Sequence, residues 1–72
     1  GHDVRVGACC TISVHCALTG GTVLEDDVFV CSGVRIIPFK SIGSRATLGA
    51  GSVVIRDVPE SVSVFGNPAR VV

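Results

Sequence analysis

The chain has 72 residues, of which 47% are apolar, and it contains three Phe but no Met, Trp or Tyr. This length allows one domain with a thin core, and because residue 1 is not Met, we expect a piece of a longer protein. Six Lys and Arg balance six Asp and Glu, no basic run occurs, and no apolar stretch approaches a membrane span, so nucleic acid and membranes are not expected partners.

The residue preferences indicate β-structure. Fourteen Val and five Ile stand against three Leu, and strands favour such an excess of β-branched residues whereas helices tolerate it poorly. The cysteines, Cys9, Cys10, Cys16 and Cys31, lack the spacing of a zinc site. We interpret them as small buried thiols in a reducing cytosol, and since the N-terminus has no signal-peptide pattern, the expected location is cytoplasmic.

An aliphatic residue recurs at every sixth position along most of the chain. The frame consists of Val6, Ile12, Leu18, Leu24, Val30, Ile36, Ile42, Leu48 and Val54. A second, mostly compact residue follows four positions after each of them. One inward aliphatic and one compact residue per six is typical of a flat-sided coil, in which three faces make a turn of 18 residues. The sequence therefore predicts an all-β, parallel β-helix of about three coils over residues 6–59.

Residues 18 apart are expected to stack in columns of similar character. The column of Ser13, Cys31 and Gly49 stays small, as a tight corner requires. Lys40 falls in an otherwise compact column. We expect its side chain to turn outward or its coil to be locally irregular.

The six-residue frame ends after Val54, at Arg56-Asp57-Val58-Pro59, where we expect the helix to stop. Apolar and polar residues then alternate from Ser61 to Phe65, which predicts a short strand, and Gly66-Asn67-Pro68 predicts a turn. Residues 60–72 are therefore expected to form a tail over the open end of the stack, whose unpaired backbone groups would otherwise promote aggregation. The whole of residues 1–72 is expected to form one domain.

Three motifs together resemble the C-terminal part of left-handed β-helix acyltransferases. They are Leu48-Gly49-Ala50-Gly51-Ser52-Val53-Val54, Arg56-Asp57-Val58-Pro59 and Gly66-Asn67-Pro68-Ala69-Arg70-Val71. The likeness covers residues 2–72 and is greatest to bacterial sugar acetyltransferases of the sialic-acid and bacillosamine type. It implies left-handed coils, a homotrimer, acetyl-CoA bound between neighbouring coils, and an N-terminal nucleotide-sugar-binding domain that this chain lacks. Periodicity alone would fit either hand.

The resemblance implies a catalytic pair at His2 and Asp3. In these enzymes a His followed by an acidic residue stands just before the first complete hexapeptides, as it does here. Histidine suits removal of a proton from the attacking amine or hydroxyl, and an adjacent carboxylate would fix its tautomer. Transfer is then direct, without a covalent intermediate. The alternative is that His2 belongs to a vector-derived terminus.

The resemblance also implies residues for acetyl-CoA. Ser32 and Ala50 match positions whose backbone lies along the pantetheine arm, and they are otherwise ordinary tight corners. Pro68 and Arg70 match a loop near the adenine and phosphates, where Arg70 can offer its guanidinium to a phosphate. Lys40 is a second candidate for that role.

Other positions are less strongly assigned. Gly20 begins a Gly-Gly turn that we expect to be open enough for a thioester to approach. Thr11 stands where many relatives have a second histidine that reaches the thioester end, and its hydroxyl can still donate a hydrogen bond. His15 is expected at an exposed corner, and Phe39 is expected to line a groove or a trimer interface.

Two other functions are compatible with this fold. A γ-type carbonic anhydrase needs three histidines on zinc, whereas this chain has two, so no metal site is expected. A non-catalytic trimeric structural or interaction module is the alternative to acetyl transfer onto a sugar, because the acceptor-binding domain is absent and the first coil is incomplete. Both O- and N-transfer fit the residues.

Overall fold

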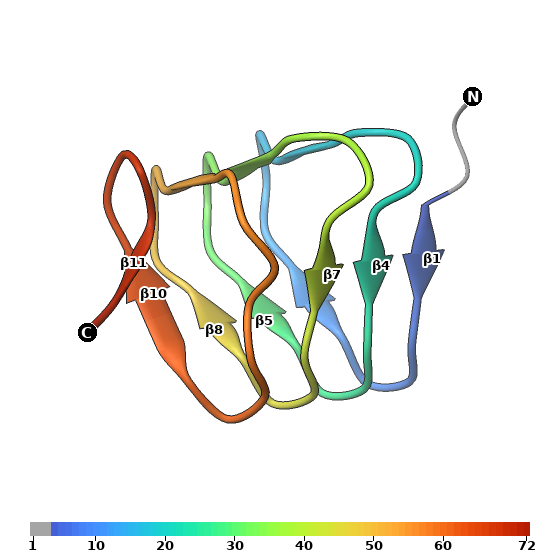
Figure 1. Cartoon of the computed structure of the whole chain (residues 1–72). Coiled ribbons are helices and arrows are strands. Elements are labelled where there is room, and N and C mark those ends of the chain that lie inside the picture. The colour runs from blue at the N-terminus through green and yellow to red at the C-terminus, as the bar shows by residue number, and fades with distance from the viewer. Residues whose placement is uncertain (1–3) are drawn as a thin grey trace.

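The structure is a computed structural model that describes residues 4–72. These residues wind into a three-sided coil of short strands and turns (Figure 1). The strands are β1 Arg5–Val6, β2 Thr11–Ile12, β3 Ala17–Leu18, β4 Val23–Leu24, β5 Phe29–Val30, β6 Arg35–Ile36, β7 Ser41–Ile42, β8 Thr47–Leu48, β9 Val53–Val54, β10 Ser63–Phe65 and β11 Arg70–Val71. A helix long and apolar enough to cross a membrane is not found in this part of the chain.

Three sheets form the faces of the coil. Face A contains β1, β4 and β7, face B contains β2, β5, β8, β10 and β11, and face C contains β3, β6 and β9. From β1 to β9 the pairing is parallel and joins residues 18 apart, as for Val6 with Leu24 and Leu18 with Ile36. The predicted parallel β-helix with 18-residue coils is confirmed.

The inward aliphatic residues fill the coil. All frame residues from Leu24 to Val54 are at most 1% exposed, and the compact residues after the turns are buried beside them. Full burial of such a side chain contributes about 1.5–3 kcal/mol. In the first coil Val6 and Ile12 are 48% and 40% exposed, because no coil of the described residues lies beyond them.

At the three corners of the prism the strands are joined by two-residue turns, and the second residue of each of these turns has a φ between 57° and 79°. The turns stack into three corners of the prism. Corner 1 contains Ala8–Cys9, Asp26–Asp27, Ser44–Arg45 and Glu60–Ser61, corner 2 contains Val14–His15, Ser32–Gly33 and Ala50–Gly51, and corner 3 contains Gly20–Gly21 and Pro38–Phe39. Corner 1 joins faces A and B, so it lies opposite face C.

The stack continues past the point where the sequence frame ends. Val58 lies only four positions after Val54, and it forms a parallel bridge with Ile42, 16 positions before it. Strand β10 also pairs in parallel with β8 at an offset of 16 residues, which places Val64 beside Leu48. The expectation that the helix stops after Val54 is therefore wrong. One turn is two residues short, and the six-residue spacing resumes from Val58 to Val64.

The tail caps this end of the coil, as expected. The predicted strand and turn are confirmed as β10 and a turn over residues 66–69, and β11 then pairs antiparallel with β10. The N–H of Ala69 donates to the carbonyl of Val53 at 2.8 Å, and the N–H of Val53 donates to the carbonyl of Gly66 at 3.0 Å. These bonds fasten the tail, red in Figure 1, to the last strand of face C.

Candidate functional site

Most of the residues assigned to acetyl-CoA surround face C. Ser32 and Ala50 lie on corner 2, Gly20 and Lys40 at corner 3, and Pro68 and Arg70 in the tail. The chain enters each strand of face C from corner 2 and leaves it toward corner 3, which explains how distant residues come to flank one surface. Thr11 is separate from them, since it lies exposed on β2 of face B. His2 and Asp3 lie outside the described residues.

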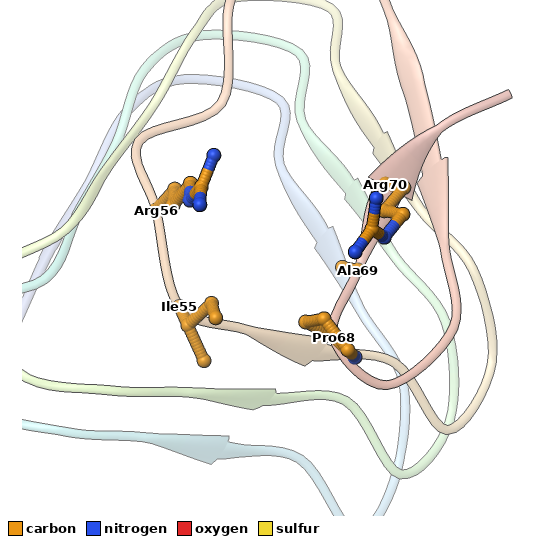
Figure 2. Close-up of a pocket in the computed structure, with 5 residues that line it drawn as sticks. All are labelled: Ile55, Arg56, Pro68, Ala69 and Arg70. Carbon is orange, nitrogen blue, oxygen red and sulfur yellow. The ribbon is translucent and has the colours of Figure 1, made fainter.

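A pocket of about 90 Å³ lies where the tail meets face C (Figure 2). It is lined by Ile55, Arg56, Pro68, Ala69 and Arg70. With two guanidinium groups in its lining, this pocket is suited to a small anion such as a phosphate group. The pocket brings Pro68 and Arg70 together, as the resemblance implies.

Arg56 is a functional candidate that the sequence analysis missed. Figure 2 shows Arg56 and Arg70 on opposite sides of the pocket, Arg56 from the segment after β9 and Arg70 from β11. A shallower hollow of about 400 Å³ beside it is also lined by both arginines. Its place in the repeat could have identified it, because residue 56 lies 36 residues, or two coils, after Gly20 and therefore belongs to the column of corner 3.

The two guanidinium groups are available to a ligand. The side-chain hydrogen bonds found within residues 4–72 involve neither the Arg56 nor the Arg70 side chain. Guanidinium groups donate paired N–H bonds that match the oxygens of a phosphate. The geometry therefore fits an anionic group held between the coil and its tail.

The charged residues are segregated across the prism. Four of the six basic residues lie on face C, at its edges or in the tail fastened to it: Arg35, Lys40, Arg56 and Arg70. Four acidic residues gather at or beside corner 1 on the opposite side: Glu25, Asp26, Asp27 and Glu60. Although the formal net charge is zero, face C presents a positive field to an approaching anion.

Corner 2 has bare backbone along two successive coils. Gly33 and Gly51 occupy the positive-φ positions there; a Cβ on Gly51 would meet no atom within 4 Å, and one on Gly33 would meet only Gly51, at 3.8 Å. Corner 3 differs, because the ring of Phe39 lies where a Cβ of Gly21 would be. The expected openness of the Gly20–Gly21 turn is therefore wrong for the side that Phe39 covers.

Lys40 illustrates how the short turn changes the packing. The backbone of its own coil is regular, since its carbonyl accepts the N–H of Val23 at 2.9 Å. The six-residue frame would place Val58 in the column of Lys40, but Val58 lies beside Ile42 instead. The lysine is half-buried. The expectation of an irregular coil at Lys40 is therefore wrong, and the irregular turn lies in the following coil.

The four cysteines are free thiols. Cys10, Cys16 and Cys31 are half-buried, while Cys9 is exposed at corner 1, so the prediction of burial is wrong for Cys9. The thiol of Cys16 donates to the carbonyl of Cys31 at 3.0 Å. Among residues 4–72, no group of three or more His, Cys, Asp and Glu side chains is placed to hold a metal ion.

Comparison with solved structures matches nearly the whole chain. The structure of PerB from Caulobacter crescentus, in complex with CoA and GDP-perosamine, is 42% identical and superposes with a TM-score of 0.97 over 99% of this chain and 34% of that one. The serine acetyltransferase of Neisseria gonorrhoeae is 28% identical, with a TM-score of 0.75 over 96% of this chain and 37% of that one.

Curated sequences give the same result, whereas no family model matches. The acyl-[acyl-carrier-protein]–UDP-N-acetylglucosamine O-acyltransferase of Ectopseudomonas mendocina is 40% identical over 71 residues, which is 97% of this chain and 27% of that protein. The serine acetyltransferase of Bacillus licheniformis is 45% identical over 49 residues, 68% of this chain and 23% of that protein.

The matched proteins are longer than this chain, which spans between about a quarter and two fifths of their length. A TM-score of 0.97 requires that the coils wind with the same hand. The chain therefore matches part of the left-handed β-helix of the hexapeptide-repeat acetyltransferases in both sequence and fold.

Proposed function

We propose that this β-helix belongs to an enzyme that transfers an acetyl group from acetyl-CoA to an amine or hydroxyl of a nucleotide-linked sugar. The observation that carries the proposal is the combination of a bare edge at corner 2 and two unengaged arginines beside the tail, both bordering face C. The presence of CoA and GDP-perosamine in the PerB complex supports the choice of both substrates.

The cofactor is proposed to lie along face C, roughly parallel to the coil axis. Arg56 and Arg70 would bind its phosphates, and Pro68 lines the same pocket. The pantetheine arm would follow the backbone of Ser32 and Ala50 on corner 2. Lys40 would add a third positive charge near the phosphates. Thr11 lies on another face, so within one protomer it does not join this set.

The proposal includes a homotrimer, because within a single chain the residues assigned to acetyl-CoA lie on different edges of face C. Gly20 lies on corner 3, and Ser32 and Ala50 lie on corner 2, at the opposite edge of face C. A pantetheine arm that follows corner 2 is separated from Gly20 by the width of face C. If corner 2 of one protomer faces another edge of a second protomer, the two sets line one groove. Outward apolar residues such as Phe29, 46% exposed, and Phe39, 79% exposed, would be covered in such an assembly.

The chemistry requires a base and a group that stabilises the oxyanion. His2, oriented by Asp3, would take the proton from the acceptor as its nitrogen or oxygen attacks the thioester carbonyl. Backbone N–H groups would stabilise the negative charge that forms on the carbonyl oxygen. The C–S bond then breaks, and the CoA thiolate takes up the proton. No covalent enzyme intermediate is formed.

The test combines calorimetric titration with acetyl-CoA and a mass measurement of the oligomeric state. A trimer that binds acetyl-CoA with micromolar affinity supports the proposal. A trimer without any affinity would favour a non-catalytic structural module, and a monomer would exclude both. His2→Ala, in a protein that includes the N-terminal domain of the family, is expected to abolish transfer while the trimer persists. Unchanged rates in that variant would refute the role of His2.

A further inference from the structure

His15 lies on the same edge as the residues proposed to follow the pantetheine arm. It is the second residue of the Val14–His15 turn on corner 2, with a φ of 62° and an exposed side chain. Gly33 and Gly51 occupy the equivalent position in the next two coils. Within residues 4–72 it is the only histidine. The proposed function, on which this inference rests, gives it no role.

The side chain at position 15 is not needed to form the turn. Gly33 and Gly51 make the same turn with no side chain at all, and a non-glycine residue in this conformation costs about 1–2 kcal/mol. An imidazole therefore stands at the end of an edge where the equivalent positions of the next two coils, Gly33 and Gly51, carry no side chain. The corresponding edge at corner 1 carries Asp27 and Arg45, so it offers no such continuous path.

Free backbone donors accompany the bare edge. The Gly51 N–H donates to the carbonyl of Ser32, and the Gly33 N–H donates to that of Val14. The N–H groups of Ser32 and Ala50 donate to no backbone acceptor among the described residues. Successive strands are about 4.8 Å apart, so these donors form a ladder along the coil axis. An extended ligand with amide carbonyls, such as a pantetheine arm, would satisfy them.

His15 lies at the end of this ladder that is farthest from Arg56 and Arg70. The tail turn, which is hydrogen-bonded to β9, lies one coil beyond Gly51 in the stacking direction. From that level to His15 there are three steps of about 4.8 Å, or about 14 Å in total. A cofactor with its phosphates at Arg56 and Arg70 would extend its thioester toward the imidazole.

We infer that His15 is a further binding residue of the site, whose imidazole N–H donates a hydrogen bond to the carbonyl oxygen of the acetyl thioester. The contact exists only when the acetyl group is present, because free CoA lacks the thioester carbonyl. The same bond would strengthen as negative charge develops on the oxygen during attack. His15 itself gains and loses no covalent bond in the reaction.

The test compares acetyl-CoA and CoA binding to the protein and to two variants. His15→Gly keeps the positive φ and copies Gly33 and Gly51, so it is expected to fold. His15→Asn also tolerates this conformation and retains an N–H donor. The matched control is Asp27→Gly, which makes the same backbone change in the second coil of corner 1. Thermal unfolding checks that each variant remains folded.

We expect His15→Gly to weaken acetyl-CoA binding about tenfold, the effect of one lost hydrogen bond, and to change CoA binding less than twofold. His15→Asn should fall between the two, and Asp27→Gly should change neither. Unchanged acetyl-CoA binding in His15→Gly would overturn the inference. Equal weakening for both ligands would also overturn it, since the contact would then not involve the acetyl group. If the unmodified protein binds neither ligand, the proposed function itself is refuted.

Discussion

The ring of Phe39 lies directly against the backbone of Gly21, one coil away on corner 3. A Cβ on Gly21 would occupy the same space as Cδ1 of the ring. Both residues have positive φ, 79° for Gly21 and 63° for Phe39, because they hold the same place in successive turns. The absence of a side chain at Gly21 therefore allows both the turn and the packing of the aromatic ring above it.

Gly21→Ala is expected to lower the free energy of unfolding by about 2–4 kcal/mol, because it adds a clash with the ring to the cost of positive φ. Gly51→Ala changes the same kind of turn where no atom lies within 4 Å, so about 1–2 kcal/mol should be lost. Urea denaturation measures both. In a Phe39→Ala background the Gly21 cost should drop to that of Gly51. A cost for Gly21→Ala that does not depend on Phe39 would contradict this explanation.

Gly43 marks the place where the short turn crosses face A. A Cβ there would collide with the backbone of Pro59 and Glu60, and the Gly43 N–H donates to the carbonyl of Val58 at 2.8 Å. Gly43→Ala should therefore cost about 3 kcal/mol, the upper part of the usual range for overpacking. In the control Gly49→Ala, the Cβ would meet mainly the Phe65 ring, which is 58% exposed, and would approach one backbone atom, the carbonyl oxygen of Val64, at 3.0 Å.

The control should lose about half as much free energy of unfolding as Gly43→Ala, because a side chain yields more easily than backbone. Equal losses measured by chemical denaturation would show that the register shift at residues 55–58 is not held rigidly.

Thr22→Val is expected to stabilise the coil. The Thr22 side chain is fully buried, and its Oγ1 has no hydrogen-bond partner in the described part of the chain. Replacing the hydroxyl by a methyl group removes its desolvation cost, so about 1 kcal/mol should be gained. Ser52 is the control: it is equally buried, but its Oγ accepts the Gly66 N–H at 3.2 Å. Ser52→Ala should lose about 1 kcal/mol, so shifts of Tm in the same direction would contradict the assignment.

Arg56→Gln and Arg70→Gln should each weaken CoA binding about tenfold, because charge-assisted hydrogen bonds to phosphate contribute about 1.5–3 kcal/mol. Arg45→Gln at corner 1 is the control, since Arg45 donates to Ser61 at 3.2 Å and lies opposite face C. Its effect should be less than twofold. Calorimetry at low salt measures all three, and added salt should reduce the differences. Similar losses in the three variants would argue for a diffuse charge effect instead of a phosphate site.

The sequence alone was sufficient to predict most of the coil. Each face needs one inward aliphatic residue per six, so the column from Val6 to Val54 could be read directly and the strand pairings followed from it. The continuation was missed because a fixed count from Val54 reaches Glu60, whereas the chain shortens one turn and resumes at Val58. Loop length is a local property that a strict period cannot reveal.

The site could be predicted only as a set of separate positions. The motif containing Ala50 and the one containing Arg70 were recognisable, but periodicity does not tell which corner is bare and which is covered. That difference depends on Phe39, whose ring covers Gly21 from 18 residues away. Arg56 was read only as part of a stop motif, because its proximity to Arg70 depends on how the tail folds back.

The separation of charge has a consequence for the kinetics of binding. A protein without net charge exerts no net electrostatic attraction on a distant polyanion. A dipole across the protein nevertheless orients the protein relative to the polyanion during the encounter. Arg35 lies on face C, and Asp27 lies on corner 1 at the opposite side. An anion is therefore attracted when face C is turned toward it and repelled when corner 1 is turned toward it. The chain can therefore select the direction from which a negatively charged molecule arrives while remaining electrically neutral overall.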